Sequence, residues 1–373
     1  MLAYKSIAEL TEAAEAQNKT ISEIVIADQA AEMESTSEKL YEKMDRSFQV
    51  MIEAVQYGQE KNQKSMSGLT GGEGYKMLHY ARVSGGGLCG SFITRALSRA
   101  LAVSGCNASM GKIVASPTAG SCGILPGCLI SMYEDKKIER RAVVMSLFTA
   151  GAFGMVIANE ANIAGAEGGC QAECGSAAAI AAAALVELEH GTPSQCADAC
   201  GIAVSNQLGL VCDPVAGLVE IPCIKRNAAG LMIAFSAADM ALAGISSEIP
   251  ADECIFAMRQ VGEALPSSLR ETSLGGLAAT PTAQKLKENI LKILTDRKCC
   301  GTLGISAKKI SNIDKGVGEQ LRQRIVGYGG QKEIPHKYMV HDEVARNRSD
   351  KDNDARFERV PQVFGHRALS RNP

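Results

Sequence analysis

The 373-residue sequence predicts a mainly α-helical fold, and three observations carry this prediction. Ser6, Thr20 and Ser35 are each followed three residues later by Glu, the pattern of a capping box that begins a helix. Residues 175–186 are nearly all alanine, the strongest helix former. The alternation of apolar and polar residues that is typical of half-buried strands is scarce. We expect a compact helical domain with glycine-rich loops, followed by a charged C-terminal tail.

Residues 1–60 are predicted to form a peripheral helical layer. Gly58 marks the expected end of its last helix, because glycine commonly follows the last helical turn. Apolar residues recur at helical spacing before it: Leu40, Met44, Phe48, Met51, Ile52 and Val55.

The middle of the chain, from residue 142 to 294, also reads as helical. Thr192 before Pro193 matches a helix N-cap followed by proline at the first helical position. Residues 228–243 are apolar with few β-branched side chains. The longest uncharged stretch, residues 142–159, contains several polar and glycine residues and is followed by Glu160. We therefore interpret it as a buried core helix and expect no membrane span.

A change in composition divides the chain near Asp296. Residues 1–296 are expected to form one domain. Residues 297–373 are rich in charge and poor in groups to bury, and we expect them to be a poorly ordered extension.

Overall composition excludes some classes of protein. The 39 Lys and Arg nearly balance the 41 Asp and Glu, and Trp is absent, so a nucleic-acid-binding protein is not expected. The 13 cysteines occur without a signal-like N-terminus, which favours the reducing cytoplasm. Only five His are present, so thiolates are the abundant soft metal ligands.

Three glycine-rich loops, at residues 65–72, 84–90 and 116–123, combine exposed backbone N–H groups with hydroxyls. None matches a P-loop or a dinucleotide-binding fingerprint. Together they favour binding of a carboxylate and an ammonium group, although each hydroxyl is individually more typical of a turn or cap. The predicted contacts are Ser67, Thr70, Ser116, Thr118 and Ser121.

Three cysteines have neighbours that indicate a fixed, irregular backbone. Cys170 follows two glycines, Cys212 precedes Asp213 and a proline, and Cys223 follows a proline. Spacing alone leaves open whether these thiols meet at one cluster or lie apart. If they meet, three thiolates leave one iron of a cubane without a protein ligand. The remaining cysteines with ordinary neighbours are expected in the core: Cys106, Cys128, Cys196, Cys200 and Cys254.

Several long motifs resemble the alpha chain of iron–sulfur-dependent L-serine dehydratase, from the N-terminus to about Ile293. They are GAEGGCQAE (165–173), GLVCDPVAGLVEIPCIKRN (209–227), SPTAGS (116–121), TAGA (149–152) and the segment 269–282. The resemblance implies a [4Fe-4S] cluster held by Cys170, Cys212 and Cys223, without pyridoxal phosphate. It also implies conversion of L-serine to pyruvate and ammonia together with a separate beta chain.

The implied reaction is an α,β-elimination in which the open iron, as a Lewis acid, binds the serine hydroxyl while a base removes the Cα proton. The base is unknown: Ser67, Ser121 and Lys225 are candidates, as is a residue of the beta chain. Lys225 and Arg226 are predicted to pair with the substrate carboxylate or to offset cluster charge, with Asp213 and Glu220 as their structural partners. Cys299 or Cys300 is a possible extra cluster ligand by analogy with some family members.

Two other readings remain open from the sequence. An L-cysteine desulfidase resembles the same catalytic fold and also eliminates from a β-substituted amino acid. The other alternative is not an enzyme: a non-catalytic, cysteine-rich subunit, which would bind no iron.

Overall fold

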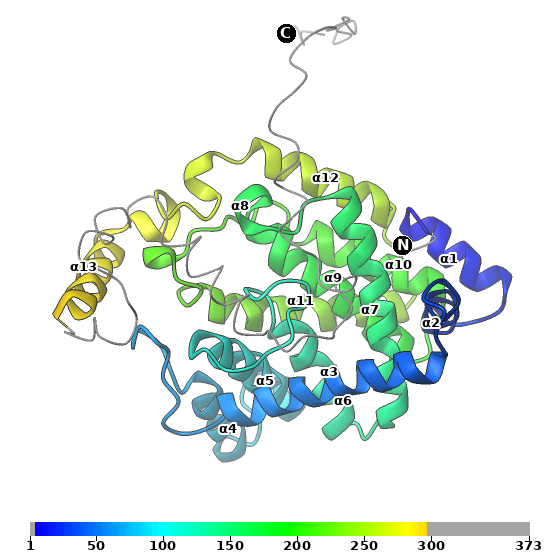
Figure 1. Cartoon of the computed structure of the whole chain (residues 1–373), viewed down its shortest axis with the longest axis horizontal. Helices are drawn as coiled ribbons and strands as arrows, with labels where there is room; N and C mark the ends of the chain where they lie inside the picture. The colour runs from blue at the N-terminus through cyan, green and yellow to red at the C-terminus, as the bar shows by residue number, and fades with distance from the viewer. Residues whose placement is uncertain (1–3, 297–373) are drawn as a thin grey trace, which may run out of the picture. The chain divides into compact units, whose positions relative to one another are not determined.

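The computed structural model describes residues 4–296, with side chains described to residue 290. Over this range the chain forms thirteen α-helices and no β-strand, which confirms the mainly helical prediction (Figure 1). The helices are α1 (Ile7–Ala16), α2 (Ile21–Glu32), α3 (Ser37–Gly58), α4 (Glu73–Val83), α5 (Gly90–Ala108), α6 (Ile124–Glu134), α7 (Arg140–Glu160), α8 (Gly165–Gly168), α9 (Ser176–Leu188), α10 (Pro193–Ser205), α11 (Cys223–Leu242), α12 (Ala251–Ala264) and α13 (Pro281–Asp296). Cys299, Cys300 and the predicted charged extension lie outside the described residues.

The alanine-rich helix α9 lies at the centre of the core. Every residue of α9 except Glu187 is buried, and the helix packs against α7, α10, α11 and α6. Small side chains let these neighbours approach closely from all sides, so the composition of residues 175–186 explains its central position. In Figure 1, α9 lies among these helices.

Helix α7 contains the long uncharged stretch. By length and composition it could cross a membrane, but 67% of its apolar window is buried inside the protein, against α9 and α2 among others. This burial agrees with the prediction of a core helix.

Helix starts follow local capping chemistry at most predicted positions. Thr20 and Thr192 form complete capping boxes with Glu23 and Gln195. The prediction at Ser35 is wrong by one residue, because Thr36 caps α3 and accepts from the Lys39 N–H. The same helix ends at Gly58, as expected.

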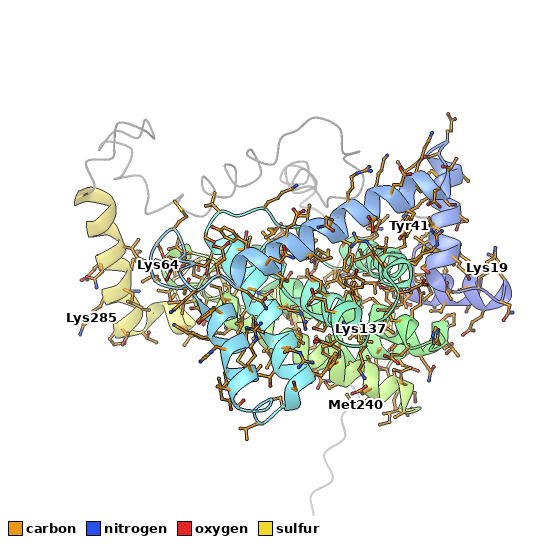
Figure 2. The ribbon with its side chains drawn as sticks, turned by 90° about the horizontal axis from the view of Figure 1, so that it is seen from below. Lys19, Tyr41, Lys64, Lys137, Met240 and Lys285 are labelled. Atoms are coloured by element: carbon orange, nitrogen blue, oxygen red, sulfur yellow. The ribbon has the colours of Figure 1, made fainter. Side chains whose placement is uncertain are left out.

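Most charged side chains lie on the outside of this helical body. Lys19, Lys64, Lys137 and Lys285, labelled in Figure 2, are all exposed. Short helical turns connect the longer helices near the cysteine segments: a π-helical turn η1 (Gln171–Gly175), and the 3-10 turns η2 (Val215–Gly217), η3 (Ser267–Leu269) and η4 (Gly276–Ala279).

Candidate functional site

The three predicted cluster cysteines are buried and come from different backbone environments. Cys170 directly precedes the π-helical turn η1, Cys212 lies in an extended segment, and Cys223 is the first residue of α11. Their exposed fractions are 2%, 3% and 8%. Gly169 turns the chain before Cys170 with φ of +77°, which a side chain would rarely adopt. The irregular backbone predicted for these cysteines holds at Cys212, whereas Cys170 and Cys223 each lie at the beginning of a helical segment.

These three thiols lie within electrostatic range of one another. Burial raises the pKa of Cys212 far above its usual value, and negative charge on Cys170 and Cys223 raises it further. Burial likewise raises the pKa of Cys223, with Cys170 as the next cause. Three neighbouring thiolates need a cationic partner, and thiolates are the ligands that hold iron–sulfur clusters in proteins. The donor set therefore suits an iron–sulfur cluster.

Cys170 differs from the other two because its thiolate is stabilised. The hydrogen bond between the Cys170 and Cys174 thiols, whose Sγ atoms lie 3.4 Å apart, is the largest cause that lowers the pKa of Cys170. The positive charge of Arg226 lowers it as well. Cys170 is thus the thiol of this trio that ionises most readily.

Of the predicted basic pair, only Arg226 joins this group. Its guanidinium donates to Asp213 Oδ1 at 2.8 Å and to the Val211 carbonyl at 2.8 Å. This pairing confirms Asp213 as a structural partner. The side chain of Lys225 is exposed, and Glu220 contacts neither residue of the basic pair in the hydrogen bonds seen among the described residues.

Glu220 instead holds the first glycine-rich loop. Its Oε2 accepts from Ser67 Oγ at 2.9 Å and from Thr70 Oγ1 at 2.7 Å, and the carboxylate side chain is almost fully buried. Because Glu220 lies between Cys212 and Cys223 in the chain, these two bonds attach residues 65–72 to the cysteine segment. The proposed contacts of both hydroxyls with a substrate stay predictions.

Asn227 attaches the loop at residues 116–123 to the same cysteine segment. This fully buried side chain donates to the carbonyls of Gly120 and Cys223 at 2.8 and 3.0 Å and accepts from the Gly123 N–H at 2.8 Å. The hydroxyls of Thr118 and Ser121 lie 3.1 Å apart. Within the described part of the chain, the buried Ser116 Oγ has no hydrogen-bond partner.

Glu173 is a site residue that the sequence reasoning missed. Its Oε1 accepts from Thr118 Oγ1 at 3.2 Å, and its negative charge raises the pKa of Cys212 and Cys223. The carboxylate thus joins the third glycine-rich loop to the cysteines. Its position three residues after Cys170 was the only signal in the sequence.

The second glycine-rich loop has local contacts instead. Thr94 Oγ1 donates to the Gly86 carbonyl and holds residues 84–90 against their own helix α5. Leu88 at its tip is fully exposed. These contacts favour the simple turn interpretation for this loop.

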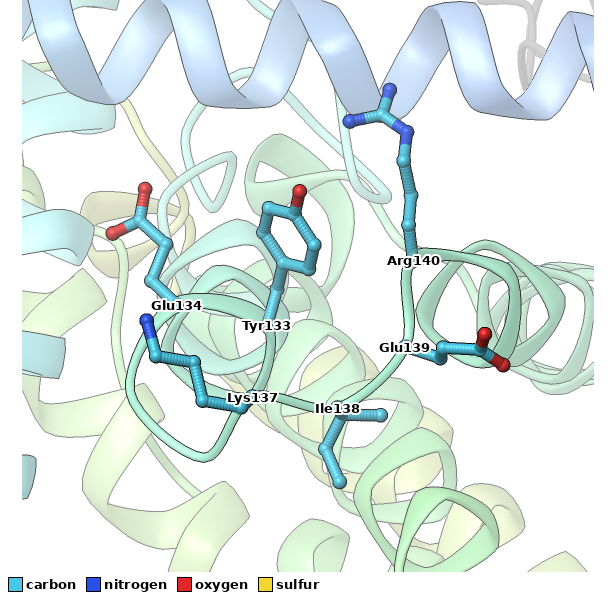
Figure 3. Close-up of a pocket in the computed structure, with 6 residues that line it drawn as sticks. All are labelled: Tyr133, Glu134, Lys137, Ile138, Glu139 and Arg140. Carbon is cyan, nitrogen blue, oxygen red and sulfur yellow. The ribbon is translucent and has the colours of Figure 1, made fainter.

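A surface hollow of about 420 Å³ lies elsewhere, between the end of α6 and the start of α7 (Figure 3). Two of its charged side chains already have partners, since Glu134 pairs with Arg99 and Arg140 pairs with Asp45. Among residues 4–296, no three His, Cys, Asp or Glu side chains are arranged to hold a single metal ion. A cubane cluster has a different requirement, because each cysteine binds its own iron.

The five cysteines predicted for the core are all buried. They are Cys106, Cys128, Cys196, Cys200 and Cys254. Burial raises the pKa of Cys106 to about 11 and raises that of Cys128 and Cys200 as well.

Comparison with known proteins gives a consistent result. The model of the family "Serine dehydratase alpha chain" matches residues 16–278. The chain is 51% identical over 287 residues to the "Probable L-serine dehydratase, alpha chain" of Bacillus subtilis (strain 168), covering 77% of this chain and 95% of that protein.

Two further relatives extend the comparison. The "L-serine dehydratase, alpha chain" of Peptoniphilus asaccharolyticus is 43% identical over 272 residues, which are 73% of this chain and 93% of the relative. "L-serine dehydratase TdcG" of Escherichia coli (strain K12) is 45% identical over 183 residues, which are 48% of this chain and 40% of TdcG. The chain belongs to the serine dehydratase alpha chain family.

Proposed function

We propose that this chain is the catalytic alpha chain of an L-serine ammonia-lyase that uses a [4Fe-4S] cluster and no pyridoxal phosphate. Cys170, Cys212 and Cys223 would hold the cluster. The observation that carries the proposal is the burial of these three thiols, which come from separate segments, in a member of this family. The reaction removes water from L-serine to give aminoacrylate, whose imine tautomer is then hydrolysed to pyruvate and ammonia.

When bound, such a cluster supplies a Lewis-acidic iron that favours departure of the serine hydroxyl. The chain's own residues would orient the rest of the substrate. Ser116 Oγ is a buried donor suited to the substrate carboxylate, and the N–H groups of residues 116–123 lie in the same loop. Arg226 offsets negative charge at Cys170.

The observed contacts weigh against two of the three residues considered as the base. The side chain of Lys225 is exposed, and the Ser67 hydroxyl is engaged as a hydrogen-bond donor to Glu220. Ser121 remains of the three: it lies in the third glycine-rich loop, its side chain is fully buried, and the hydrogen bond that it donates to the Ser116 carbonyl is long, at 3.4 Å.

We further propose a beta chain as partner and the cytoplasm as location. The relatives from Bacillus subtilis and Peptoniphilus asaccharolyticus are named as alpha chains, which supports a second subunit. All eleven cysteines in the described residues are free thiols, which supports a reducing compartment.

Anaerobic co-expression with a beta chain tests the proposal. We expect purified complex to form pyruvate from L-serine and to contain iron and acid-labile sulfide. Sulfide release from L-cysteine, at a higher rate than pyruvate formation from L-serine, would favour the desulfidase. Absence of both iron and turnover would favour a non-catalytic subunit.

A further inference from the structure

Arg270 is paired through its backbone with Cys212, a proposed cluster ligand. The two residues form a parallel β-bridge. Its hydrogen bonds run from the Cys212 N–H to the Leu269 carbonyl at 2.8 Å and from the Glu271 N–H to the Cys212 carbonyl at 2.7 Å. Residues paired in this way project their side chains to the same face of the bridge. The Arg270 side chain therefore leaves the backbone on the same side as the Cys212 thiol.

Both side chains reach the short helix α8. A β-carbon built on Gly165, its first residue, would stand 3.0 Å from Cys212 Sγ. Arg270 Nη1 donates to the carbonyl of Glu167, two residues further along the same helix, at 3.5 Å. The guanidinium and the thiol of the proposed cluster ligand are therefore neighbours beside α8.

The guanidinium of Arg270 has donors that the chain does not use. It carries several N–H donors in a fixed planar fork. Within residues 4–296, its one hydrogen bond is the long contact with the Glu167 carbonyl, a neutral acceptor. No Asp or Glu of the described residues forms an ion pair with it. Because the side chain is half-buried, an anion beside it would offset the cost of removing its charge from water.

The backbone that carries Arg270 is held in a fixed conformation next to the Cys212 segment. Glu271 and Ser273 have φ of +62° and +57°, which residues with a side chain rarely adopt. The Ser273 hydroxyl donates to the Pro214 carbonyl at 2.6 Å and so attaches this turn to the cysteine segment. Backbone strain of this kind persists only where the surroundings maintain it, and it is concentrated at binding sites. The guanidinium is therefore preorganised relative to Cys212.

The basic pair at residues 225–226 is less suited to bind an anion. Arg226 is already engaged by Asp213 at 2.8 Å. The Lys225 side chain is exposed, so water and salt weaken any ion pair that it forms. Arg270 combines partial burial with uncommitted donors. Its planar fork also matches a carboxylate in shape, and such pairs are frequently bidentate.

We propose that Arg270 binds the carboxylate group of the amino-acid substrate. This inference rests on the proposed function. In L-serine the carbon that bears the carboxylate is bonded to the carbon that bears the hydroxyl. The group that recognises the carboxylate must therefore lie beside the cysteines that would hold the iron. Arg270 meets this requirement through its pairing with Cys212. It is then a specificity-determining residue that selects amino acids over amino alcohols.

The test compares Arg270→Gln and Arg270→Lys with wild type in the anaerobically purified complex with the beta chain. Glutamine removes the charge, whereas lysine keeps the charge but loses the planar fork. We expect KM for L-serine to rise about 10- to 150-fold in Arg270→Gln, the effect of losing a hydrogen bond between charged groups. The rise in Arg270→Lys should be smaller. Iron and sulfide contents should be unchanged in both variants.

Arg259→Gln is the matched control. The exposed Arg259 guanidinium also donates to a backbone carbonyl, that of Glu160, at 3.2 Å. Its removal therefore takes away a contact of the same kind at a distance from the bridge. This variant should keep the wild-type KM for L-serine and the wild-type iron and sulfide contents.

Two fragments of the substrate separate a carboxylate contact from a structural role. L-alanine has the carboxylate without the hydroxyl, and ethanolamine has the hydroxyl without the carboxylate. By calorimetry, Arg270→Gln should weaken L-alanine binding about 10- to 150-fold and ethanolamine binding less than about 3-fold.

Three results would overturn the inference: a wild-type complex that does not bind L-alanine, L-alanine binding that is unchanged in Arg270→Gln, or equal weakening of both fragments, which would indicate a structural role. If the wild-type complex formed no pyruvate, the proposed function would fail. The calorimetric comparison of the two fragments would still decide the role of Arg270.

Discussion

Asp213 and Arg226 form an ion pair at 2.8 Å that joins the two ends of the cysteine segment. Asp213 directly follows Cys212, and Arg226 is three residues after Cys223, so the pair fixes the separation of these two thiols. Asp213 Oδ2 also accepts from the Leu277 N–H at 2.7 Å. One buried carboxylate thus attaches three segments of the site.

Asp213→Asn should be strongly destabilising, because it leaves the Arg226 guanidinium in a largely buried place without its counter-charge. We expect the free energy of unfolding to fall by about 3 kcal/mol, within the range for a broken buried pair. Urea unfolding of the reduced chain measures this. The Asp45–Arg140 pair is the matched control, since both its side chains are about a third exposed. Asp45→Asn should cost less than about 1 kcal/mol, and equal losses at both pairs would contradict the account.

Gly165→Ala should damage the site while the helices remain folded. The added methyl group would stand 2.8 Å from Glu173 Oε2 and 3.0 Å from Cys212 Sγ, so one of them must move. We expect lower iron content after anaerobic purification, with an unchanged far-UV circular dichroism spectrum.

Gly151→Ala in α7 is the control for Gly165→Ala, because a β-carbon there meets nothing within 4 Å. It should raise the free energy of unfolding by about 0.5–1 kcal/mol, since alanine is the better helix former. A Gly165→Ala variant that retains full iron content would show that the close approach at Gly165 is unimportant.

Glu187 should make stability depend on pH on the acid side. Burial raises its pKa above the usual 4.5, although Ser22 and Thr149 favour the charged form. The folded state therefore binds a proton more tightly than the unfolded state, and the stability contributed by the protonated group is lost as pH rises from about 4.5 through the folded pKa.

Relative to Glu187→Gln, the wild-type free energy of unfolding should fall by up to about 1.4 kcal/mol per pH unit across this window. Urea titrations at several pH values measure the difference. Glu189→Gln, at an exposed position just after the same helix, should show no such change relative to wild type. Parallel profiles for wild type and Glu187→Gln would disprove the expected proton uptake.

Features set by neighbours in sequence were predictable. Thr20 and Thr192 begin helices because the capping box depends only on residues three apart. The alanine-rich residues 175–186 were predicted to be helical for an equally local reason, since alanine is the strongest helix former. The predicted cap at Ser35 was wrong because the hydroxyl of Thr36, one residue later, can cap the helix in the same way. The capping pattern alone does not distinguish between two adjacent hydroxyls.

Contacts between distant segments were not predictable from spacing. Glu220 was expected near Lys225 and Arg226 but instead accepts from Ser67 and Thr70, about 150 residues away. The place of Glu173 in the site could not be predicted, because it depends on residues that only the fold brings near it. These are Thr118, Gly120, Gly165 and Cys212. The cysteines were recognised through long motifs, since their spacing left the shared cluster undecided.

The most direct measurement is made on Cys212→Ala in the anaerobically purified complex with a beta chain. Pyruvate formation from L-serine, and iron and sulfide per chain, are compared with wild type and with Cys200→Ala, a fully buried cysteine in the core. The account predicts that Cys212→Ala loses cluster and activity while Cys200→Ala keeps both. Pyruvate formation at the wild-type rate by Cys212→Ala would contradict it.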